Sequence, residues 1–298
     1  MDINNKYVIY SLTDRGLFSE LSNMLAAIIY SKQHERMFVL NTYNWKARVD
    51  KGWTDYFEDT IECENSILTS QSSLFTTNWK RPFFSIKKKF FDILNRIALV
   101  KYNICFSSNV YQHLSNIEDG KYMNDYKDQI ANYARELIRL NSKSKQYIES
   151  LKKSINLPVE YIGVHIRRGD KITTNEMEDI SLEKYLSAIN DAKEISKNVY
   201  IATDDTSIIE YIKFELAKEN VKIFTNNTLC ENGYNQTRFN RADKTYRYDI
   251  TMNTLADAFI LCDSKYFIGT YSSNLSRFVA LKKGFEKCKS LDVQEWYI

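Results

Sequence analysis

The chain has 298 residues, of which 44% are hydrophobic and 27% charged, and its formal net charge is +3. This length allows two domains with sizeable cores, while only 8 glycines and 2 prolines argue against low-complexity linkers. The small basic excess does not by itself indicate a nucleic-acid partner, and no run of about 20 apolar residues predicts a membrane-spanning helix.

The cysteines and the N-terminal segment bear on the cellular compartment. The five cysteines include no CxxC pair, and they are Cys63, Cys105, Cys230, Cys262 and Cys288. Their odd number and wide spacing favour reduced structural thiols over a disulfide framework or a zinc site. The segment MDINNKYVIYSLTDRG has neither the basic start nor the long apolar core of a signal peptide, so we expect a cytoplasmic protein.

The first forty residues have the pattern of a β-turn-α-β unit. Residues 6–11 and residues 37–40 predict buried strands, and Gly16 lies in the turn that follows the first of them. Between the strands, apolar residues recur at helical spacing: Phe18, Leu21, Leu25, Ile28 and Ile29. This order is typical of a layered α/β domain.

The middle of the chain is less regular. Residues 45–110 are rich in aromatic residues, and a second helix is predicted around residues 128–140. Within residues 79–101, basic residues alternate with Phe, Ile and Leu. This segment fits an interfacial helix at a membrane, a core helix with a solvated lysine face, or a surface that stacks on acceptor sugars. The rest of the chain has no RNA-binding motif, so we expect no nucleic acid.

From Pro158 onward, predicted strands and helices alternate. The strands are residues 160–166, 199–202, 221–224 and 266–268. The helices are residues 182–195, 207–217, 250–262 and 274–283, and residues 225–248 are predicted as an irregular polar loop. Such alternation implies right-handed crossovers and a parallel sheet, in which ligands bind beyond the carboxyl ends of the strands.

The strand at residues 160–166 leads into the sequence His165-Ile166-Arg167-Arg168-Gly169-Asp170-Lys171. Because side chains alternate along a strand, His165 and Arg167 face one side of the sheet and Arg168 the other. A guanidinium at a strand end can bind phosphate oxygens in bidentate fashion and stays charged at any working pH. The alternative is a surface Arg–Asp pair that closes a turn. The Arg-Gly-Asp adhesion tripeptide is here interpreted as incidental, because it follows a buried strand.

Two further strand ends carry polar residues. Asp204-Asp205 follows the strand at residues 199–202, where it either places a carboxylate beside a ligand or caps the next helix. Ser272-Ser273-Asn274 precedes the last helix, and the N–H groups and hydroxyls at a helix N-terminus either bind an anion or simply cap the helix. Neither GxGxxG nor GxxxxGK[ST] occurs, which argues against NAD and P-loop chemistry.

These strand ends, taken in order, resemble the GDP-fucose-dependent fucosyltransferases related to the α1,6-fucosyltransferases, the core α1,6 and rhizobial nodulation group. The family pattern Val-His-x-Arg-Arg-x-Asp-Lys matches residues 164–171, and the Ala-Thr-Asp-Asp strand end matches residues 202–205. The family's helix aspartate, which lies 15 residues before a Ser-Ser pair, matches Asp257. The resemblance covers residues 5–60 and 158–298.

The N-terminal half contributes a turn and a helix that lead to Asn44-Trp45, then to Gly52-Trp53 and Phe57. The resemblance implies an α/β, GT-B-like architecture with two Rossmann-like domains, of which the C-terminal one is a parallel sheet that binds the nucleotide sugar. We expect an N-terminal acceptor-side domain at residues 1–155, which includes the irregular aromatic and basic insertion. A C-terminal GDP-sugar-binding domain is expected at residues 156–298.

The resemblance also implies an activity: inverting, metal-independent transfer of L-fucose from GDP-β-L-fucose to a glycan hydroxyl, with an α-linkage formed and no cofactor. Arg167 would hold the β-phosphate and stabilise the leaving GDP, and Arg168 would lie near the donor sugar and support the site. His165 and Asp257 would recognise guanine, whose N1–H and N2–H₂ groups suit one carboxylate. The other implied donor-binding or catalytic residues are Asp170, Lys171, Asp204, Asp205, Ser272, Ser273 and Asn274.

The acceptor hydroxyl must lose a proton, and the family's candidate base is a glutamate soon after the Asp-Lys pair. Glu176 is our choice, but the segment is one residue longer than the family's, so Glu178, Asp179 and a solvated acidic loop stay open. We find no counterpart of the family's membrane anchor, coiled coil, SH3 domain or disulfide framework, so the acceptor is not fixed. The alternatives are a transferase for another GDP-sugar, a catalytically inactive glycan- or nucleotide-binding module, and an adhesion protein.

Overall fold

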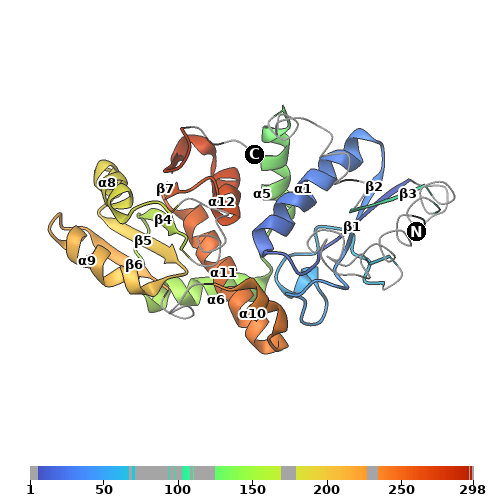
Figure 1. Ribbon diagram of the computed structural model, residues 1–298, viewed down its shortest axis with the longest axis horizontal. Coiled ribbons are helices and arrows are strands. Elements are labelled where there is room, and N and C mark those ends of the chain that lie inside the picture. Colours follow the sequence, from blue (N-terminus) through green and yellow to red (C-terminus); the bar gives the residue numbers. More distant parts are fainter. Residues whose placement is uncertain are drawn as a thin grey trace. The chain divides into compact units, whose positions relative to one another are not determined.

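The computed structural model describes residues 6–66, 69–70, 93, 97, 103–107, 110, 125–168, 179–226, 234–294 and 296. The chain divides into two compact units, Met1–Arg139 and Leu140–Ile298, and each contains a parallel sheet of its own (Figure 1). The boundary expected after residue 155 lies later in the chain than this division. The reason is that helix α6 (Ser142–Ser154) packs against α11 (Lys244–Asp263) of the second unit.

The first unit contains a parallel sheet with the strand order β2-β1-β3. Its strands are β1 (Tyr7–Ser11), β2 (Met37–Asn41) and β3 (Ile104–Phe106). Helix α1 (Leu17–Gln33) links β1 to β2, and α5 (Lys127–Leu137) packs against α1. The predicted β-turn-α-β opening and the second predicted helix are therefore confirmed.

A loop that follows β2 is held by a carboxylate and shaped by a glycine. Asp55, at the end of the 3-10 helix η1 (Trp53–Asp55), accepts hydrogen bonds from the four backbone N–H groups of residues 49–52 at 2.8–3.1 Å. Gly52 has a φ of +83°, and a Cβ atom there would lie 1.9 Å from Thr42 Oγ1. Only glycine fits this backbone conformation and this space.

The aromatic residues of the N-terminal resemblance belong to the core of the first unit. The side chains of Trp45, Trp53 and Phe57 are buried, and the rings of Trp53 and Phe57 stack with centroids 4.2 Å apart. Trp53 Nε1 donates a hydrogen bond to the carbonyl oxygen of Glu58 at 3.0 Å. These residues therefore form part of the hydrophobic core of the first unit.

The second unit contains a parallel sheet with the strand order β6-β5-β4-β7-β8. Its strands are β4 (Ile162–Ile166), β5 (Asn198–Thr203), β6 (Lys222–Thr225), β7 (Tyr266–Gly269) and β8 (Cys288–Ser290). The remaining helices are α8 (Leu182–Ala192), η4 (Thr206–Ile208), α9 (Ile209–Ala217), α10 (Gln236–Arg241), α12 (Asn274–Lys283) and η5 (Phe285–Lys287). The chain leaves β4 toward β5 and β6 and later returns to β7, so the order reverses between β4 and β7. Such a switch point is where doubly wound sheets bind ligands.

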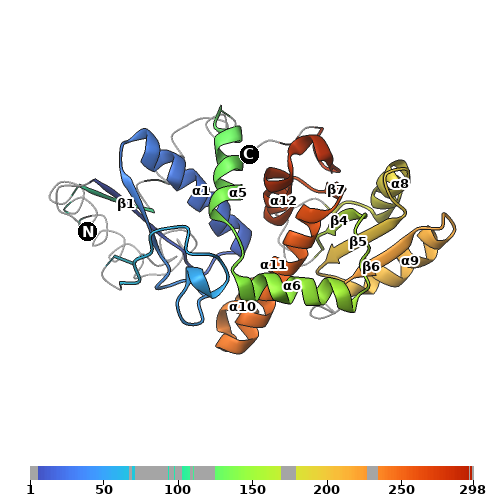
Figure 2. The same cartoon turned by 180° about the vertical axis from the view of Figure 1, so that it is seen from behind.

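The two faces of this sheet have different neighbours (Figure 2). Alternate residues of β4 and β5, including Val164 and Ile201, pack with α8 and α9 in one hydrophobic core. The other alternate residues, including Gly163 and Tyr200, face α11. A Cβ atom on Gly163 would lie 2.8 Å from Ser264 Oγ and 3.0 Å from Leu261 Cδ2, so the glycine lets α11 lie close to the sheet.

Several details differ from the sequence prediction, including strands β3 and β8, which were not predicted. The predicted loop at residues 225–248 contains α10 and the first turn of α11. These segments are mostly polar, so apolar residues do not recur in them at helical spacing. Helix α8 ends at Ala192, so Ile195, predicted on its apolar face, is 47% exposed. Helix α6 was not predicted, because only Ser144 and Ile148 of its side chains are buried.

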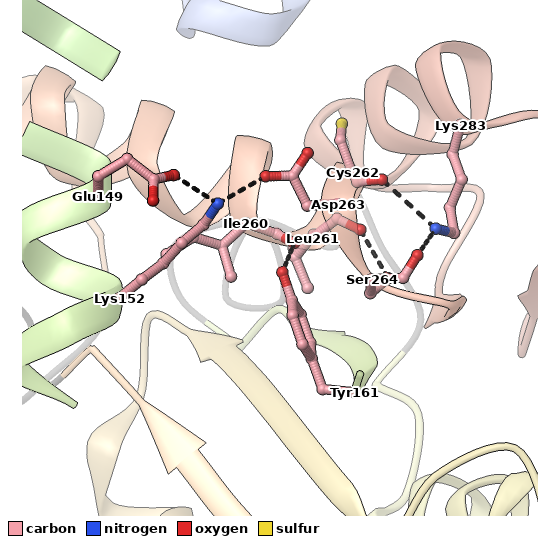
Figure 3. A network of polar contacts seen from close by, with 9 residues as sticks. All are labelled: Glu149, Lys152, Tyr161, Ile260, Leu261, Cys262, Asp263, Ser264 and Lys283. Atoms are coloured by element: carbon pink, nitrogen blue, oxygen red, sulfur yellow. Dashed lines mark hydrogen bonds and ion pairs between the residues drawn. The ribbon is translucent and has the colours of Figure 1, made fainter. Parts of the chain in front are cut away.

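The C-terminal end of α11 is held by side chains from three other elements (Figure 3). Tyr161 donates its hydroxyl hydrogen to the carbonyl oxygen of Ile260 at 2.8 Å. The ammonium group of Lys283, on α12, donates to the carbonyl oxygens of Cys262 and Ser264. Lys152 of α6 bridges Glu149 and Asp263 with 2.8 Å contacts to each. A cation at this end complements the helix dipole and fixes the position of α11.

Candidate functional site

The candidate site lies at the carboxyl ends of β4, β5 and β7. In the register of β4 and β5, His165 lies opposite Ala202 and Ile166 opposite Thr203, so Arg167 and Asp204 follow as the next pair. Arg167 Nη1 lies 2.6 Å from Asp204 Oδ2, and the two side chains are 16% and 9% exposed. The backbone N–H of Arg168 donates to Asp204 Oδ1 at 2.8 Å. One carboxylate therefore fixes both predicted arginines at the strand end.

The adjacent aspartate has a different task. Asp205 is the N-cap of η4, and its Oδ1 accepts hydrogen bonds from the backbone N–H and the hydroxyl of Ser207 at 3.0 and 2.5 Å. The sequence left open whether this Asp-Asp pair caps the next helix or places a carboxylate beside a ligand. In the structure Asp205 is the cap, and Asp204 places its carboxylate in the strand-end cluster. Strand alternation directs the two side chains to opposite sides.

The guanidinium of Arg167 has a second neighbour. Its Cζ atom lies 5.4 Å from the ring centroid of Tyr234, which precedes α10. A cation over an aromatic face is stabilised electrostatically, and more so when both groups are shielded from water. Tyr234 was not among the predicted site residues, and no local motif marks it.

His165 occupies the same face of the sheet as Arg167 and is almost completely buried. Its Nδ1 lies 2.8 Å from Ser276 Oγ and 3.5 Å from Ser273 Oγ, both on the segment that forms the start of α12. Burial lowers the pKa of His165 to about 4; Asp204 opposes this shift and Arg167 adds to it. The imidazole is therefore neutral at physiological pH and can act as a hydrogen-bonding group but not as a cation.

Asp257 comes from α11, on the side of the helix that faces β5. Its Oδ1 accepts a hydrogen bond from the Tyr200 hydroxyl at 2.6 Å and a longer one from Asn226 Nδ2 at 3.4 Å. Burial raises the pKa of Asp257 to about 7, although both hydrogen bonds act in the opposite direction. A carboxyl group whose pKa is close to physiological pH is typical of a functional site.

The predicted phosphate cradle at the start of α12 has other partners in this structure. The backbone N–H groups of Tyr271 and Ser272 donate to the two carboxylate oxygens of Asp292, at 2.6 and 2.9 Å. Burial opposes ionisation of Asp292, but hydrogen bonds from Ser272, Ser290 and Tyr271 outweigh it and lower the pKa. Ser273 lies near His165, and Asn274 Oδ1 accepts from Arg277. A phosphate-binding role for Ser272, Ser273 and Asn274 stays a prediction.

Several predicted residues lie outside the described part of the chain: Asp170, Lys171, Glu176 and Glu178. Asp179 is described, and its Oδ1 lies 3.5 Å from Arg168 Nη2 while its side chain is 51% exposed. Most of residues 79–101 also lies outside. Across the described ranges, no group of three or more His, Cys, Asp or Glu residues is arranged to hold a metal ion. None of the described helices is long and apolar enough to cross a bilayer.

Comparison with known proteins places the chain among sugar transferases. A family model described as alpha-(1,6)-fucosyltransferase N- and catalytic domains matches residues 21–282. The structure of POFUT1 in complex with GDP-fucose is similar, with a TM-score of 0.60 and 12% identity over 100% of this chain and 98% of that chain. The NodZ alpha-1,6-fucosyltransferase soaked with GDP-fucose has a TM-score of 0.51 and 15% identity over 93% and 92%. Together with the two parallel sheets, these likenesses confirm the expected α/β, GT-B-like fold.

Proposed function

Because the chain belongs to the α-(1,6)-fucosyltransferase family and is therefore a glycosyltransferase, we propose that it transfers L-fucose from GDP-β-L-fucose to a hydroxyl group of a glycan. In this proposal the reaction inverts the anomeric centre, gives an α-linkage and needs no metal. The observation that carries it is the Arg167–Asp204 ion pair at the switch point of the second sheet. His165 and Asp257 lie on the same face of that sheet.

The donor half of the proposal assigns one task to each group. Arg167 binds the β-phosphate, because a planar guanidinium held by a carboxylate presents its N–H groups in a fixed direction. Arg168 supports the donor sugar, and His165 and Asp257 bind guanine. Solved structures of POFUT1 hold GDP or GDP-fucose, which supports this donor.

The chemical step is a displacement at the anomeric carbon of fucose. The acceptor oxygen forms a bond to this carbon while the bond from the carbon to the β-phosphate oxygen breaks, and GDP leaves with the electron pair. Negative charge grows on the diphosphate, so a fixed guanidinium stabilises the transition state more than the ground state. The acceptor proton passes to a carboxylate, for which Glu176 stays our choice and Glu178 and Asp179 the alternatives.

The donor assignment is tested by measuring nucleotide release from a panel of GDP- and UDP-sugars, together with thermal unfolding. We expect release from GDP-fucose alone, and a melting temperature raised by GDP and not by UDP. Release from another GDP-sugar would select the alternative transferase, and a melting temperature unaffected by GDP would refute the donor site. Activity in EDTA tests the metal-free mechanism. Cytoplasmic location and membrane contact through residues 79–101 stay predictions.

A further inference from the structure

A continuous set of hydrogen bonds lies behind the Asp257 carboxylate. Tyr200, from β5, and Asn226, just after β6, both donate to Asp257 Oδ1, at 2.6 and 3.4 Å. Asn226 also donates to Asn253 Oδ1 at 3.1 Å, and Asn253 lies one turn earlier on α11. Tyr147 of α6 donates to the same Asn253 oxygen at 3.0 Å. Tyr200 and Asn226 therefore contact the carboxylate directly, and Asn253 and Tyr147 lie behind Asn226.

The two carboxylate oxygens of Asp257 differ in their hydrogen bonds. Within the described part of the chain, the hydrogen bonds to this side chain all go to Oδ1, and none goes to Oδ2. Tyr200 is fully buried, whereas Asp257 is only half-buried. The tyrosine thus anchors Oδ1, and Oδ2 keeps its capacity to accept a hydrogen bond from a ligand.

The position of Tyr200 follows from the strand. Val199 and Ile201 point into the core under α8 and α9, so Tyr200 points to the opposite face, toward α11. Gly163 on the neighbouring strand lets α11 lie close to the sheet, which brings Asp257 within reach of a tyrosine hydroxyl. The contact is therefore built into the packing of the helix on the sheet.

We propose that Tyr200 is a positioning residue that holds the Asp257 carboxylate in place as the acceptor for a guanine base. Asn226 supports the same oxygen more weakly, and Asn253 and Tyr147 orient Asn226. The inference rests on the assignment of Asp257 to guanine under the proposed function. It adds that nucleotide affinity depends on a tyrosine that does not itself touch the nucleotide.

The protonation of Asp257 gives this role a measurable signature. A hydrogen bond to the ionised carboxylate lowers its pKa, which burial otherwise raises, and the result is about 7. The protonated form loses its charge and presents an O–H in place of one acceptor oxygen, so it binds the N1–H and N2–H₂ groups of guanine less well. GDP affinity therefore falls as the pH falls through about 7. Without the tyrosine hydroxyl the pKa rises further and the fall begins at a higher pH.

Other groups near α11 do not produce the same profile. The titratable or charged groups of its packed neighbours include Tyr200 on β5, His165 on β4, Lys143, Tyr147, Glu149 and Lys152 on α6, Arg238 on α10, and Lys282 and Lys283 on α12. Burial raises the pKa of Tyr200 and of Tyr147, and that of His165 is about 4, so none of these three titrates near neutral pH. On α11 itself, Asp249 and Tyr248 lie near Tyr147.

The test compares Tyr200→Phe with Tyr161→Phe by calorimetric titration of GDP across a pH range centred on about 7. Tyr161 is a matched control, because its ring lies 6.4 Å from that of Tyr200 and its hydroxyl also bonds α11, at the Ile260 carbonyl oxygen. For Tyr200→Phe we expect about tenfold weaker GDP binding at neutral pH and recovery at higher pH. More protons should be released per bound GDP at neutral pH. For Tyr161→Phe we expect a lower melting temperature with an unchanged pH profile.

The outcomes separate the inference from the function on which it rests. If the wild-type protein binds GDP with this pH dependence but Tyr200→Phe does not shift it, the role of Tyr200 is refuted. If the wild-type protein does not bind GDP at any pH, the proposed function fails instead. If Tyr200→Phe does not fold, Asn226→Ala replaces it, with a smaller shift in the same direction expected because its contact is longer. An unshifted profile there would equally overturn the inference.

Discussion

Asp55 in the first unit and Asp204 in the second both organise the chain after a parallel strand, but with different partners. Asp55 accepts four backbone N–H groups at 2.8–3.1 Å and has no cation among the bonds that hold it. Asp204 accepts one backbone N–H and pairs with Arg167 at 2.6 Å. The first carboxylate fixes only backbone, whereas the second fixes a side chain that can bind an anion. The role of each aspartate therefore follows from the partners that it binds.

The same contrast holds for Glu20 and Asp257, the two carboxyl groups with raised pKa among the described residues. Glu20, on α1, is buried and accepts the hydroxyl and the backbone N–H of Thr13 at 2.5 and 3.2 Å, so it closes the turn after β1. Asp257 is only half-buried and is anchored from behind through one oxygen. Glu20 therefore holds a loop of the first unit, whereas Asp257 of the second unit presents a carboxylate on the side of α11 that faces β5.

The largest effect is expected from Arg167→Ala, which removes the side chain that Asp204 holds. Loss of the cation at the diphosphate should reduce kcat about a thousandfold in a donor-turnover assay. The variant should also lose stability, because Asp204 keeps a buried charge without its ion pair. Arg167→Ala combined with Asp204→Asn should recover the melting temperature but not the rate. A near-normal rate in the single variant would show that Arg167 does not bind the phosphate.

Gly52→Ala tests the structural role of the loop that Asp55 holds in the first unit. A φ of +83° and a Cβ 1.9 Å from Thr42 Oγ1 should cost the first unit about 3 kcal/mol of stability. Urea unfolding monitored by tryptophan fluorescence measures this, since Trp45 and Trp53 are buried there. The GDP dissociation constant of the folded fraction should stay unchanged. Wild-type stability in this variant would contradict the assigned loop geometry.

Lys283→Met tests how much the lysine at the C-terminal end of α11 stabilises the second unit. Removing the ammonium from the carbonyl oxygens of Cys262 and Ser264 should lower the unfolding free energy by about 1–2 kcal/mol. The neighbouring Lys282→Met is the control, because Lys282 lies over the rings of Phe259 and Phe278 and not at the helix end. Equal losses in the two variants, measured by denaturant titration, would argue against a specific role for Lys283 at the end of α11.

Glu20→Gln should have the smallest effect, and one that depends on pH. Burial raises the pKa of Glu20 above its ordinary 4.5, so ionisation favours the unfolded chain and stability declines as pH rises above 4.5. The glutamine variant should therefore unfold at a higher denaturant concentration than wild type at neutral pH, with the difference vanishing in acid. An advantage that persists in acid would show that the gain has another cause.

Local periodicity predicted the main elements of both sheets. Strands β1, β2, β4, β5, β6 and β7 were recognised because a buried strand needs only a short apolar run between turn residues. Helix α6 was not predicted, because its packing on α11 needs few apolar residues. Its N-cap Asn141 and the lysines in its last turn are sequence signals that would have indicated a helix. The prediction of a loop at residues 225–248 was wrong for a related reason. Helix α10 and the first turn of α11 are polar on most faces, so they show no apolar periodicity.

The residue types that follow each strand, and the face on which they lie, could be predicted from the sequence, because side-chain alternation is a local property of the chain. It therefore placed His165 and Arg167 together and identified Asp257 through the family resemblance. Only the tertiary structure decided the partners: Asp204 for Arg167, Ser276 for His165, Tyr200 for Asp257 and Asp292 for the turn before α12. These pairs join segments 20 to over 100 residues apart. Their contacts depend on strand order and on how closely α11 lies on the sheet, which no local pattern records.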